Sequence, residues 1–348
     1  MKLYKKHILD LGKVITGKTP RTSILENYGG KIPFLTPSDN LSEKFSPTTS
    51  KTLTKIGLNE VKNCLLPSKS ICVSCIGSDL GKVVLTKKPT VTNQQFNSIV
   101  PNKENDADFI YYLMTVVGKH LNYLSKTSTA VPIINKSTFA NYEIEIPNIK
   151  EQKRIGKILS SLDDKIELNR RINDNLEQQA QALFKSWFVD FEPFKKGKFI
   201  DSELGMIPEG WQVEELGNIT NSITEKVGKR TDIKVLSPVN TGDLLLSEEY
   251  FTKQVYSKNL AKYIMVAPND FAYNPARINI GSIGMNTFDF SGCVSPVYIV
   301  FRCEKEYHHF FKIFKATKIF KEEVNTRAIG GVRQTLSYKD FSLIKIVY

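Results

Sequence analysis

The stretch EQKRIGKILSSLDDKIELNRRINDNLEQQAQALFKSWFVDFEPF, from Glu151 to Phe194, decides the fold of this chain. Between Gly156 and Pro193 it contains neither glycine nor proline, and its apolar residues recur every three to four positions. This spacing predicts one long amphipathic helix that ends at Pro193. Such a rod of roughly 40 residues would span about 60 Å. Similar globular segments on its two sides favour a protein with two reading sites.

The residues reached by alternating steps of four and three along this helix are mostly apolar, and this is the spacing of a coiled-coil seam. Asn169 and Asn173 are polar positions on the seam, which would lower stability and fix the register. The alternative is a helix that packs only on its own domain, but the rod is longer than a small domain can cover. We therefore expect helix-to-helix pairing through the apolar seam residues Ile155, Leu159, Leu162, Ile166, Leu176, Leu183 and Trp187.

The segments on either side of the helix resemble each other at an offset near 200 residues. LGKVITGKT at 11–19 matches LGNITNSIT at 216–224, and the segment 65–85 matches 265–285. In both copies, short apolar runs broken by Gly, Pro, Asn and Ser predict strands and turns. Each copy adds one helix-like segment, Ala107–Leu124 or Tyr307–Val324.

The predicted fold class is therefore α+β: two similar domains, each a small sheet plus a helix, joined by a long coiled-coil-type helix. The expected boundaries are 1–147 for the first domain, 148–194 for the central helix, 195–210 for a linker and 211–348 for the second domain.

The charge of the chain favours an anionic partner. The net charge is +12, the pI is about 9.2, and the excess of basic residues lies mainly in 1–150. Nucleic acid is the commonest partner of such a surface, and general solubility is the alternative. The chain has 5 cysteines, too few for a disulfide framework at this length, so we expect reduced packing residues. It has no apolar stretch of membrane-spanning length and no signal peptide, so a cytoplasmic location is expected.

One motif invites an enzymatic interpretation. GKVITGKT at Gly12–Thr19 fits the phosphate-loop pattern, which would make the chain a DNA-dependent nucleoside triphosphatase. That loop must open into a helix, but Pro20 follows at once and the second copy lacks the motif. No catalytic set, metal cluster or cofactor motif is recognisable otherwise. We expect a non-catalytic chain without a cofactor, and a protein scaffold is the remaining alternative.

The residues around the central helix resemble the specificity subunits of type I restriction–modification systems. The resemblance rests on IEIPNIKEQKRIGKILSSLDDKIELNRRINDNLEQQAQALFKSWFVDFEPF followed by LGMIPEGW, above all on LFKSWFVDF at Leu183–Phe191. In the flanking segments only a skeleton matches, namely Gly17–Pro20, Pro37–Asn40, Asn93–Phe96 and Gly330–Val332.

This resemblance implies a DNA reader in which each target recognition domain grips half of a split sequence in double-stranded DNA. Methyltransferase subunits would dock on the helix, and restriction/translocase subunits would join them. The duplication also predicts a second conserved helix after the second domain, whereas the sequence stops at Tyr348. We therefore expect the seam to be covered by a second copy of the chain, by a separate chain carrying the distal helix, or by the methyltransferase subunit.

Base-contact candidates come from polar residues on loops that align between the copies. In the first copy they are Lys18, Arg21, Ser38, Asn40, Ser78, Gln94, Gln95, Ser128 and Thr129. In the second copy they are Lys229, Arg230, Asn240, Arg277, Asn279, Arg327 and Arg333. For each of them, a solvated turn residue is the alternative to a base contact.

Overall fold

The computed structural model describes residues 2–45, 48–77, 79–125, 133–251, 254–304, 307–328 and 335–347. Contacts divide the chain into unit 1, Met1–Arg171, and unit 2, Ile172–Tyr348. The two units are described separately below.

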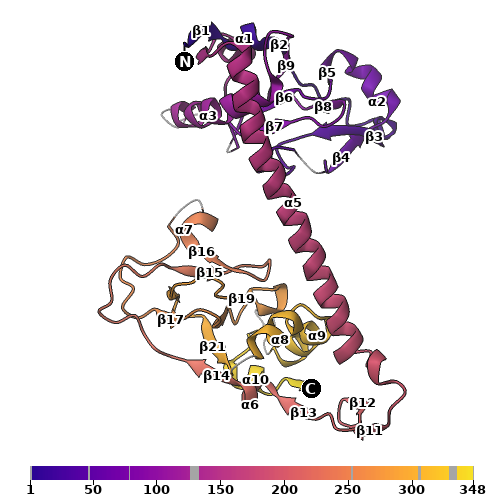
Figure 1. Cartoon of the computed structure of the whole chain (residues 1–348), viewed down its shortest axis with the longest axis vertical. Helices are drawn as coiled ribbons and strands as arrows, with labels where there is room; N and C mark the ends of the chain where they lie inside the picture. The colour runs from indigo at the N-terminus through magenta and orange to yellow at the C-terminus, as the bar shows by residue number, and fades with distance from the viewer. Residues whose placement is uncertain are drawn as a thin grey trace. The chain divides into compact units, whose positions relative to one another are not determined.

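Unit 1 is built around a sheet in which strands follow the order β2-β9-β6-β7 (Figure 1). A second sheet has the order β4-β3-β8-β5, and β1 pairs with β10. The strands are β1 (Tyr4–His7), β2 (Gly12–Thr16), β3 (Tyr28–Leu35), β4 (Lys51–Leu53), β5 (Leu65–Leu66), β6 (Ile71–Ser74), β7 (Val83–Leu85), β8 (Thr90–Thr92), β9 (Phe96–Pro101) and β10 (Glu143–Ile146). The helices are α1 (Ile8–Leu11), α2 (Lys55–Glu60), α3 (Ala107–Ser125), α4 (Lys136–Ala140) and the first turns of α5 (Ile149–Phe188).

Helix α3 closes the core of unit 1, because its apolar face, including Ile110 and Met114, is buried against residues of β6 and β7. Helix α5 crosses the start of α3 at Gly156. A Cβ atom at this position would lie 2.5 Å from Oδ1 of Asp106 and 3.0 Å from the backbone nitrogen of Phe109. The glycine inside the helix is therefore required by the close approach of α5 to α3 rather than by backbone conformation.

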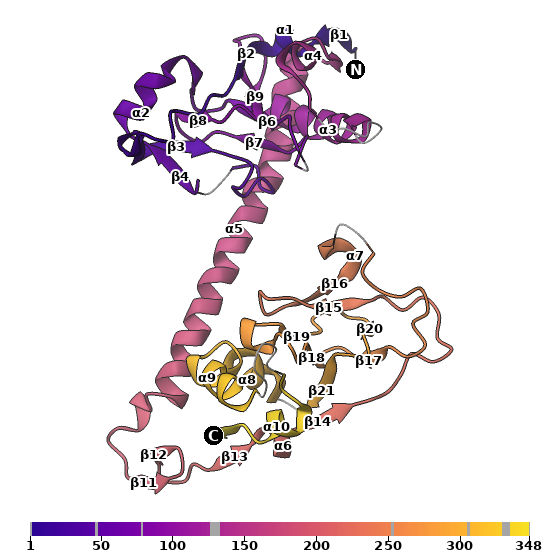
Figure 2. The same ribbon diagram turned by 180° about the vertical axis from the view of Figure 1, so that it is seen from behind.

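Unit 2 repeats the main sheet of unit 1 (Figure 2). Its strands follow the order β14-β21-β18-β19, and β13 pairs with β22 as β1 does with β10. The strands are β11 (Phe199–Ser202), β12 (Gly205–Pro208), β13 (Val213–Glu215), β14 (Thr220–Ile223), β15 (Leu236–Pro238), β16 (Leu244–Leu246), β17 (Ile264–Val266), β18 (Phe271–Tyr273), β19 (Ile283–Met285), β20 (Gly292–Val294), β21 (Ile299–Cys303) and β22 (Lys345–Val347). The helices are α6 (Leu216–Ile219), α7 (Ser247–Tyr250), α8 (Tyr307–Phe314), α9 (Lys318–Arg327) and α10 (Tyr338–Ser342).

The registers of the two main sheets agree. Ile71 is paired with Leu85 in unit 1, and Phe271 is paired with Met285 in unit 2. The turn before each of these strands also contains a non-glycine residue in the left-handed region, Lys69 with φ 64° and Asn269 with φ 67°. Matching topology, register and backbone conformation confirm the predicted pair of similar α+β domains.

Two details of the helices differ from the predictions. The α-helix α5 ends at Phe188 rather than at Pro193. The ring of a helical Pro193 would collide with the carbonyl of Val189, so the chain leaves the helix early. Phe191 adopts a left-handed conformation before a short 3₁₀ turn at Glu192–Phe194.

The predicted helix Tyr307–Val324 is divided into α8 and α9. Thr317 caps α9, and its hydroxyl accepts a 3.2 Å hydrogen bond from the N–H of Phe320. Because of this break, both Phe314 and Phe320 can reach the core of unit 2.

Helix α5 is held differently by the two units. In unit 1, Ile155 packs against the core and Leu159 is half-buried. In unit 2, the side chain that enters the core is Phe184, at 6% exposure, with its ring 5.1 Å from that of Phe310. The neighbouring Leu183, which the sequence analysis assigned to the pairing seam, is 59% exposed.

Most of the predicted seam is also accessible, with Leu162 and Leu176 at 55% and 57% exposure and with Ile166 and Trp187 exposed. Pairing through this seam therefore stays a prediction.

The cysteines are free thiols. Burial raises the pKa of the Cys72 thiol to about 12 and that of Cys75 to about 11, so both stay protonated at neutral pH. Among the described residues, no group of His, Cys, Asp and Glu has the arrangement of a metal site. Within the same ranges, no helix has the length and apolar character needed to cross a bilayer.

Candidate nucleic-acid interface

Three loops of unit 1 meet at one end of its strands. Strands β3 and β8 are parallel, with Leu35 opposite Thr92, so the segments that follow them lie side by side. These segments are Thr36–Asn40 and Asn93–Gln95, and the N–H of Asn93 donates to the carbonyl of Leu35 at 3.0 Å. The third loop, Gly17–Thr19, joins them because the N–H of Lys18 donates to the carbonyl of Thr92 at 2.9 Å. The structure therefore brings together Lys18, Ser38, Asn40, Gln94 and Gln95.

Hydrogen bonds orient several of these side chains. Gln94 accepts a 2.6 Å bond from the hydroxyl of Thr19 through Oε1. Gln95 is half-buried and accepts a 2.8 Å bond from Nδ2 of the buried Asn93 through Oε1. Thr19 and Asn93 belong to motifs that the sequence analysis quoted, but their supporting role depends on contacts that spacing does not show.

The loop Thr36–Asn40 is also closed by its own side chains. Ser38 shares a 2.7 Å hydroxyl contact with Thr36, and Oδ1 of Asn40 accepts a 3.0 Å bond from the N–H of Ser42. Asp39 accepts 2.7 Å and 2.6 Å bonds from the backbone N–H groups of Thr36 and Ser50. These bonds leave Ser38 and Asn40 exposed on a tied loop.

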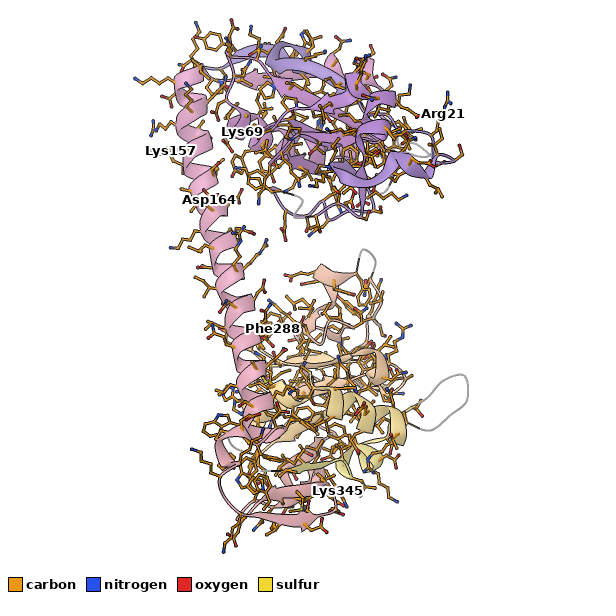
Figure 3. The ribbon with its side chains drawn as sticks, turned by 90° about the vertical axis from the view of Figure 1, so that its right-hand side faces the viewer. Arg21, Lys69, Lys157, Asp164, Phe288 and Lys345 are labelled. Carbon is orange, nitrogen blue, oxygen red and sulfur yellow. The ribbon has the colours of Figure 1, made fainter. Side chains whose placement is uncertain are left out.

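Arg21 extends this surface past α2. Its backbone N–H donates a 2.9 Å bond to Oε2 of Glu60, and this bond, with the charges of Arg21 and Lys18 nearby, lowers the pKa of the Glu60 carboxyl. Figure 3 places Arg21 at the side of unit 1 away from the first turns of α5, which carry Lys157. Ser78, Ser128 and Thr129 lie outside the described residues.

The local geometry does not fit a phosphate loop. Strand β2 ends at Thr16, and the next helical turn is a 3₁₀ turn at Leu25–Asn27. The N–H of Lys18, which a bound phosphate would need, donates instead to the carbonyl oxygen of Thr92. The nucleotide interpretation of Gly12–Thr19 is therefore not favoured.

Unit 2 also brings two polar loops together, the one after β15 and the turn between β18 and β19. Asn240 follows β15, and the turn Arg277–Gly281 packs against it so closely that a Cβ on Gly281 would lie 2.8 Å from the carbonyl oxygen of Asn240. The hydroxyl of Ser282 donates a 2.8 Å bond to the carbonyl of Pro238 and fixes this arrangement. Asn240, Arg277 and Asn279 are thus brought together, and all three are exposed.

A partly buried lysine just after the C-terminal end of α8, Lys315, holds the loop that contains Asn240. Nζ of Lys315 donates a 2.8 Å bond to the carbonyl of Gly242, and burial lowers the pKa of this ammonium group. The sequence analysis missed Lys315, because its position in the amphipathic segment 307–324 suggested an ordinary helix surface.

The remaining candidates of unit 2 are placed elsewhere. Lys229 and Arg230 lie on a separate turn, where Arg230 is paired with Glu225 at 2.6 Å. Arg327 is the last residue of α9, not a loop residue as expected, and it is paired with Glu323 at 3.0 Å. Arg333 lies outside the described residues.

Comparisons with known proteins agree with this architecture. A family model described as the type I restriction modification DNA specificity domain matches residues 2–178. The chain belongs to this family. Among solved structures, the S subunit of a type I restriction–modification system from M. genitalium superposes with a TM-score of 0.55 at 17% identity, over 100% of this chain and 84% of that chain. This likeness supports the fold.

Two curated relatives are specificity subunits. The MjaIX subunit of Methanocaldococcus jannaschii is 37% identical over 220 residues, which is 62% of this chain and 50% of the relative. The HindI subunit of Haemophilus influenzae is 37% identical over 176 residues, which is 49% of this chain and 38% of the relative. The chain therefore matches about half or less of the length of these relatives.

Proposed function

We propose that this chain is a sequence-specific DNA-recognition subunit of a type I restriction–modification complex and is itself non-catalytic. The observation that carries the proposal is that two units with main sheets of the same topology each present a group of exposed polar loop residues. Each unit would contact one half of a bipartite target, with polar side chains at base edges and lysines at phosphates. Membership of the specificity-domain family supports this role.

The domains of the proposal keep the boundaries expected from the sequence, 1–147 and 211–348 for the recognition domains and 148–194 for the central helix. In unit 1 the candidates are Lys18, Arg21, Ser38, Asn40, Gln94 and Gln95. In unit 2 the strongest candidates are Asn240, Arg277 and Asn279, since Arg230 and Arg327 are engaged in ion pairs. Gln95 is the weakest candidate of unit 1, because Asn93 holds its side chain.

The proposed protein partners bind the exposed face of α5. Leu162, Ile166 and Leu176 are exposed together on a helix that is otherwise rich in charge. Methyltransferase subunits would dock there, with restriction/translocase subunits joining them, and a second copy or a separate chain would pair with the same seam.

A genome-wide map of adenine methylation, made with and without the gene, tests the proposal. Loss of methylation at an asymmetric split motif is the expected result. Loss at a gapped palindrome would indicate a symmetric assembly of two copies. An unchanged map in a strain that produces the protein would contradict the proposed function.

A further inference from the structure

The loop that follows β3 faces solvent in its first part and contacts helix α5 in its second part. Its first part, Thr36–Asn40, presents the candidate residues Ser38 and Asn40 to solvent. Its second part, Ser42–Phe45, lies against helix α5 and lines a groove of about 490 Å³ with Glu167 and other α5 residues. One short segment therefore connects the candidate DNA surface with the helix.

Lys44 makes the central contact of this second part. Its side chain is 7% exposed, and Nζ donates bonds of 2.7 Å to Oδ1 of Asp108 and 2.8 Å to Oγ of Ser160. A third bond of 3.2 Å goes to the hydroxyl of Tyr112. The three donors of the ammonium group are thus used, one on α5 and two on α3.

Neighbouring groups extend the network along α5. The hydroxyl of Tyr112 donates a 2.5 Å bond to Oδ2 of Asp163. Glu43, next to Lys44, forms a 3.5 Å ion pair with Arg170. Asp108 also forms a 2.9 Å ion pair with Lys69, and Lys69 is labelled in Figure 3. Every member has a partner of opposite charge or a hydrogen-bond partner. The network therefore fixes the geometry of the contact between the loop and α5 as well as its strength.

The chain between the two ends is constrained. Leu41 is buried in the core, and the side chain of Asn40 accepts bonds from the N–H and the hydroxyl of Ser42. The carbonyl of Lys44 accepts a 2.7 Å bond from the N–H of Leu85 in β7. The segment between Asn40 and Lys44 is therefore short and constrained, as a route for coupling between its two ends requires.

We propose that Lys44 is a positioning residue that couples engagement of DNA by the Thr36–Asn40 loop to the setting of helix α5 on unit 1. This inference rests on the proposed function and adds a route by which DNA contact reaches the helix. Coupling is reciprocal, so a partner bound to α5 would in turn bias the Thr36–Asn40 loop.

Hydrogen exchange on the full chain tests the coupling, with and without a duplex that carries the motif found by methylation mapping. In the wild type, DNA is expected to change exchange of the α5 amides between Gly156 and Arg171 by about fivefold or more. Lys44→Met should abolish this change. Ser160→Ala, which removes only the bond on the helix and leaves the Lys44–Asp108 pair, should reduce it and does not depend on Lys44→Met folding.

The control is Lys119→Met, which removes an exposed cation from α3 and should leave the response unchanged. If the wild type binds the duplex without any change in α5, the coupling is refuted. A full response in both Lys44→Met and Ser160→Ala would refute it as well. A wild type that binds no duplex would instead refute the proposed function, so the two failures are distinguishable.

Discussion

The hydroxyl of Thr19 donates a 2.6 Å hydrogen bond to Oε1 of Gln94, a residue 75 positions further along the chain. The bond joins two loops of the candidate interface and orients an exposed amide, leaving its Nε2 group as a donor. A glutamine held in one orientation can distinguish base edges, whereas a freely rotating one presents donor and acceptor interchangeably.

Thr19→Val removes this hydrogen bond with little change in volume. Loss of one bond between neutral groups costs about 0.5–1.5 kcal/mol, so affinity for the cognate duplex should fall by up to roughly tenfold. Fluorescence anisotropy with cognate and single-substituted duplexes would measure both affinity and discrimination. Thr22→Val, at an exposed position three residues later, is the control. Equal effects of the two substitutions would contradict a role for the Gln94 orientation.

Arg277 and Arg230 are both exposed in unit 2 and differ in their surroundings, so their substitutions can be compared directly. Arg230 is paired with Glu225, whereas Arg277 belongs to the turn that packs through Gly281 against Asn240. Arg277→Ala should cost about 1–3 kcal/mol of specific binding and relax the preference at one base pair. Arg230→Ala should have a smaller effect that is uniform across sequences. A reversed order in duplex-binding titrations would show that the interface is misplaced.

Phe184 and Leu183 are adjacent on α5 but face different surroundings. Phe184 is 6% exposed in the aromatic cluster of unit 2, and Leu183 is 59% exposed. Phe184→Ala should lower the free energy of unfolding of unit 2 by about 3–5 kcal/mol. Leu183→Ala should change it by no more than about 0.5 kcal/mol. Trp187 and Trp211, both in unit 2, make tryptophan fluorescence in denaturant a local probe.

Asp108 makes the stability of unit 1 dependent on acid pH. Burial raises the pKa of its carboxyl, but the hydrogen bonds and charges of Lys44 and Lys69 outweigh burial, so the pKa is lowered overall. The stabilisation is therefore complete above the unfolded-state pKa of about 3.9 and is lost as pH falls through the folded-state value.

Asp108→Asn tests this acid dependence. It should cost about 1.5–3 kcal/mol at neutral pH and flatten the pH dependence of unfolding below about pH 4. Circular dichroism in urea at a series of pH values would show it. Glu104→Gln, at an exposed position, should retain the wild-type slope.

The accessible seam of α5 should affect assembly rather than folding. Leu162→Gln and Leu176→Gln place polar groups at positions that are already exposed, so the unfolding of each unit should change by no more than about 0.5 kcal/mol. The same substitutions should weaken association with the partner that covers the seam, which is measurable by co-purification with the methyltransferase subunit and by sedimentation. Unchanged association would remove the seam from the proposed docking surface.

The sequence predicted the features that repeat along the chain. The spacing of Ile155 and Leu159 indicated a long helix, and the offset of 200 residues indicated two copies that the matched registers confirm. The heptad spacing placed Leu183 on the pairing seam, which stays a prediction, and gave no signal for Phe184, because the burial of Phe184 depends on the domain that packs on it. The break at Thr317 was missed because the apolar period continues through it.

The candidate site could be predicted only as a set of loops. Lys18, Asn40 and Gln94 are far apart in the sequence, and their proximity follows from the parallel pairing of β3 and β8. Lys44 carried no signal, since a lysine between polar residues is ordinarily a solvated turn. Its partners Asp108 and Ser160 are 64 and 116 residues away.

Strand β1 has a consequence for the synthesis of the protein. Tyr4–His7 is made well before its partner strand, Glu143–Ile146, which is made immediately before α5. Contacts between segments so distant in sequence form slowly. The two-stranded sheet of β1 and β10 therefore cannot form until most of unit 1 has been translated, and α5 is made directly afterwards. A pause in translation before residue 146 would prolong exposure of an unpaired strand, whereas a pause within α5 would allow the first unit to finish folding alone.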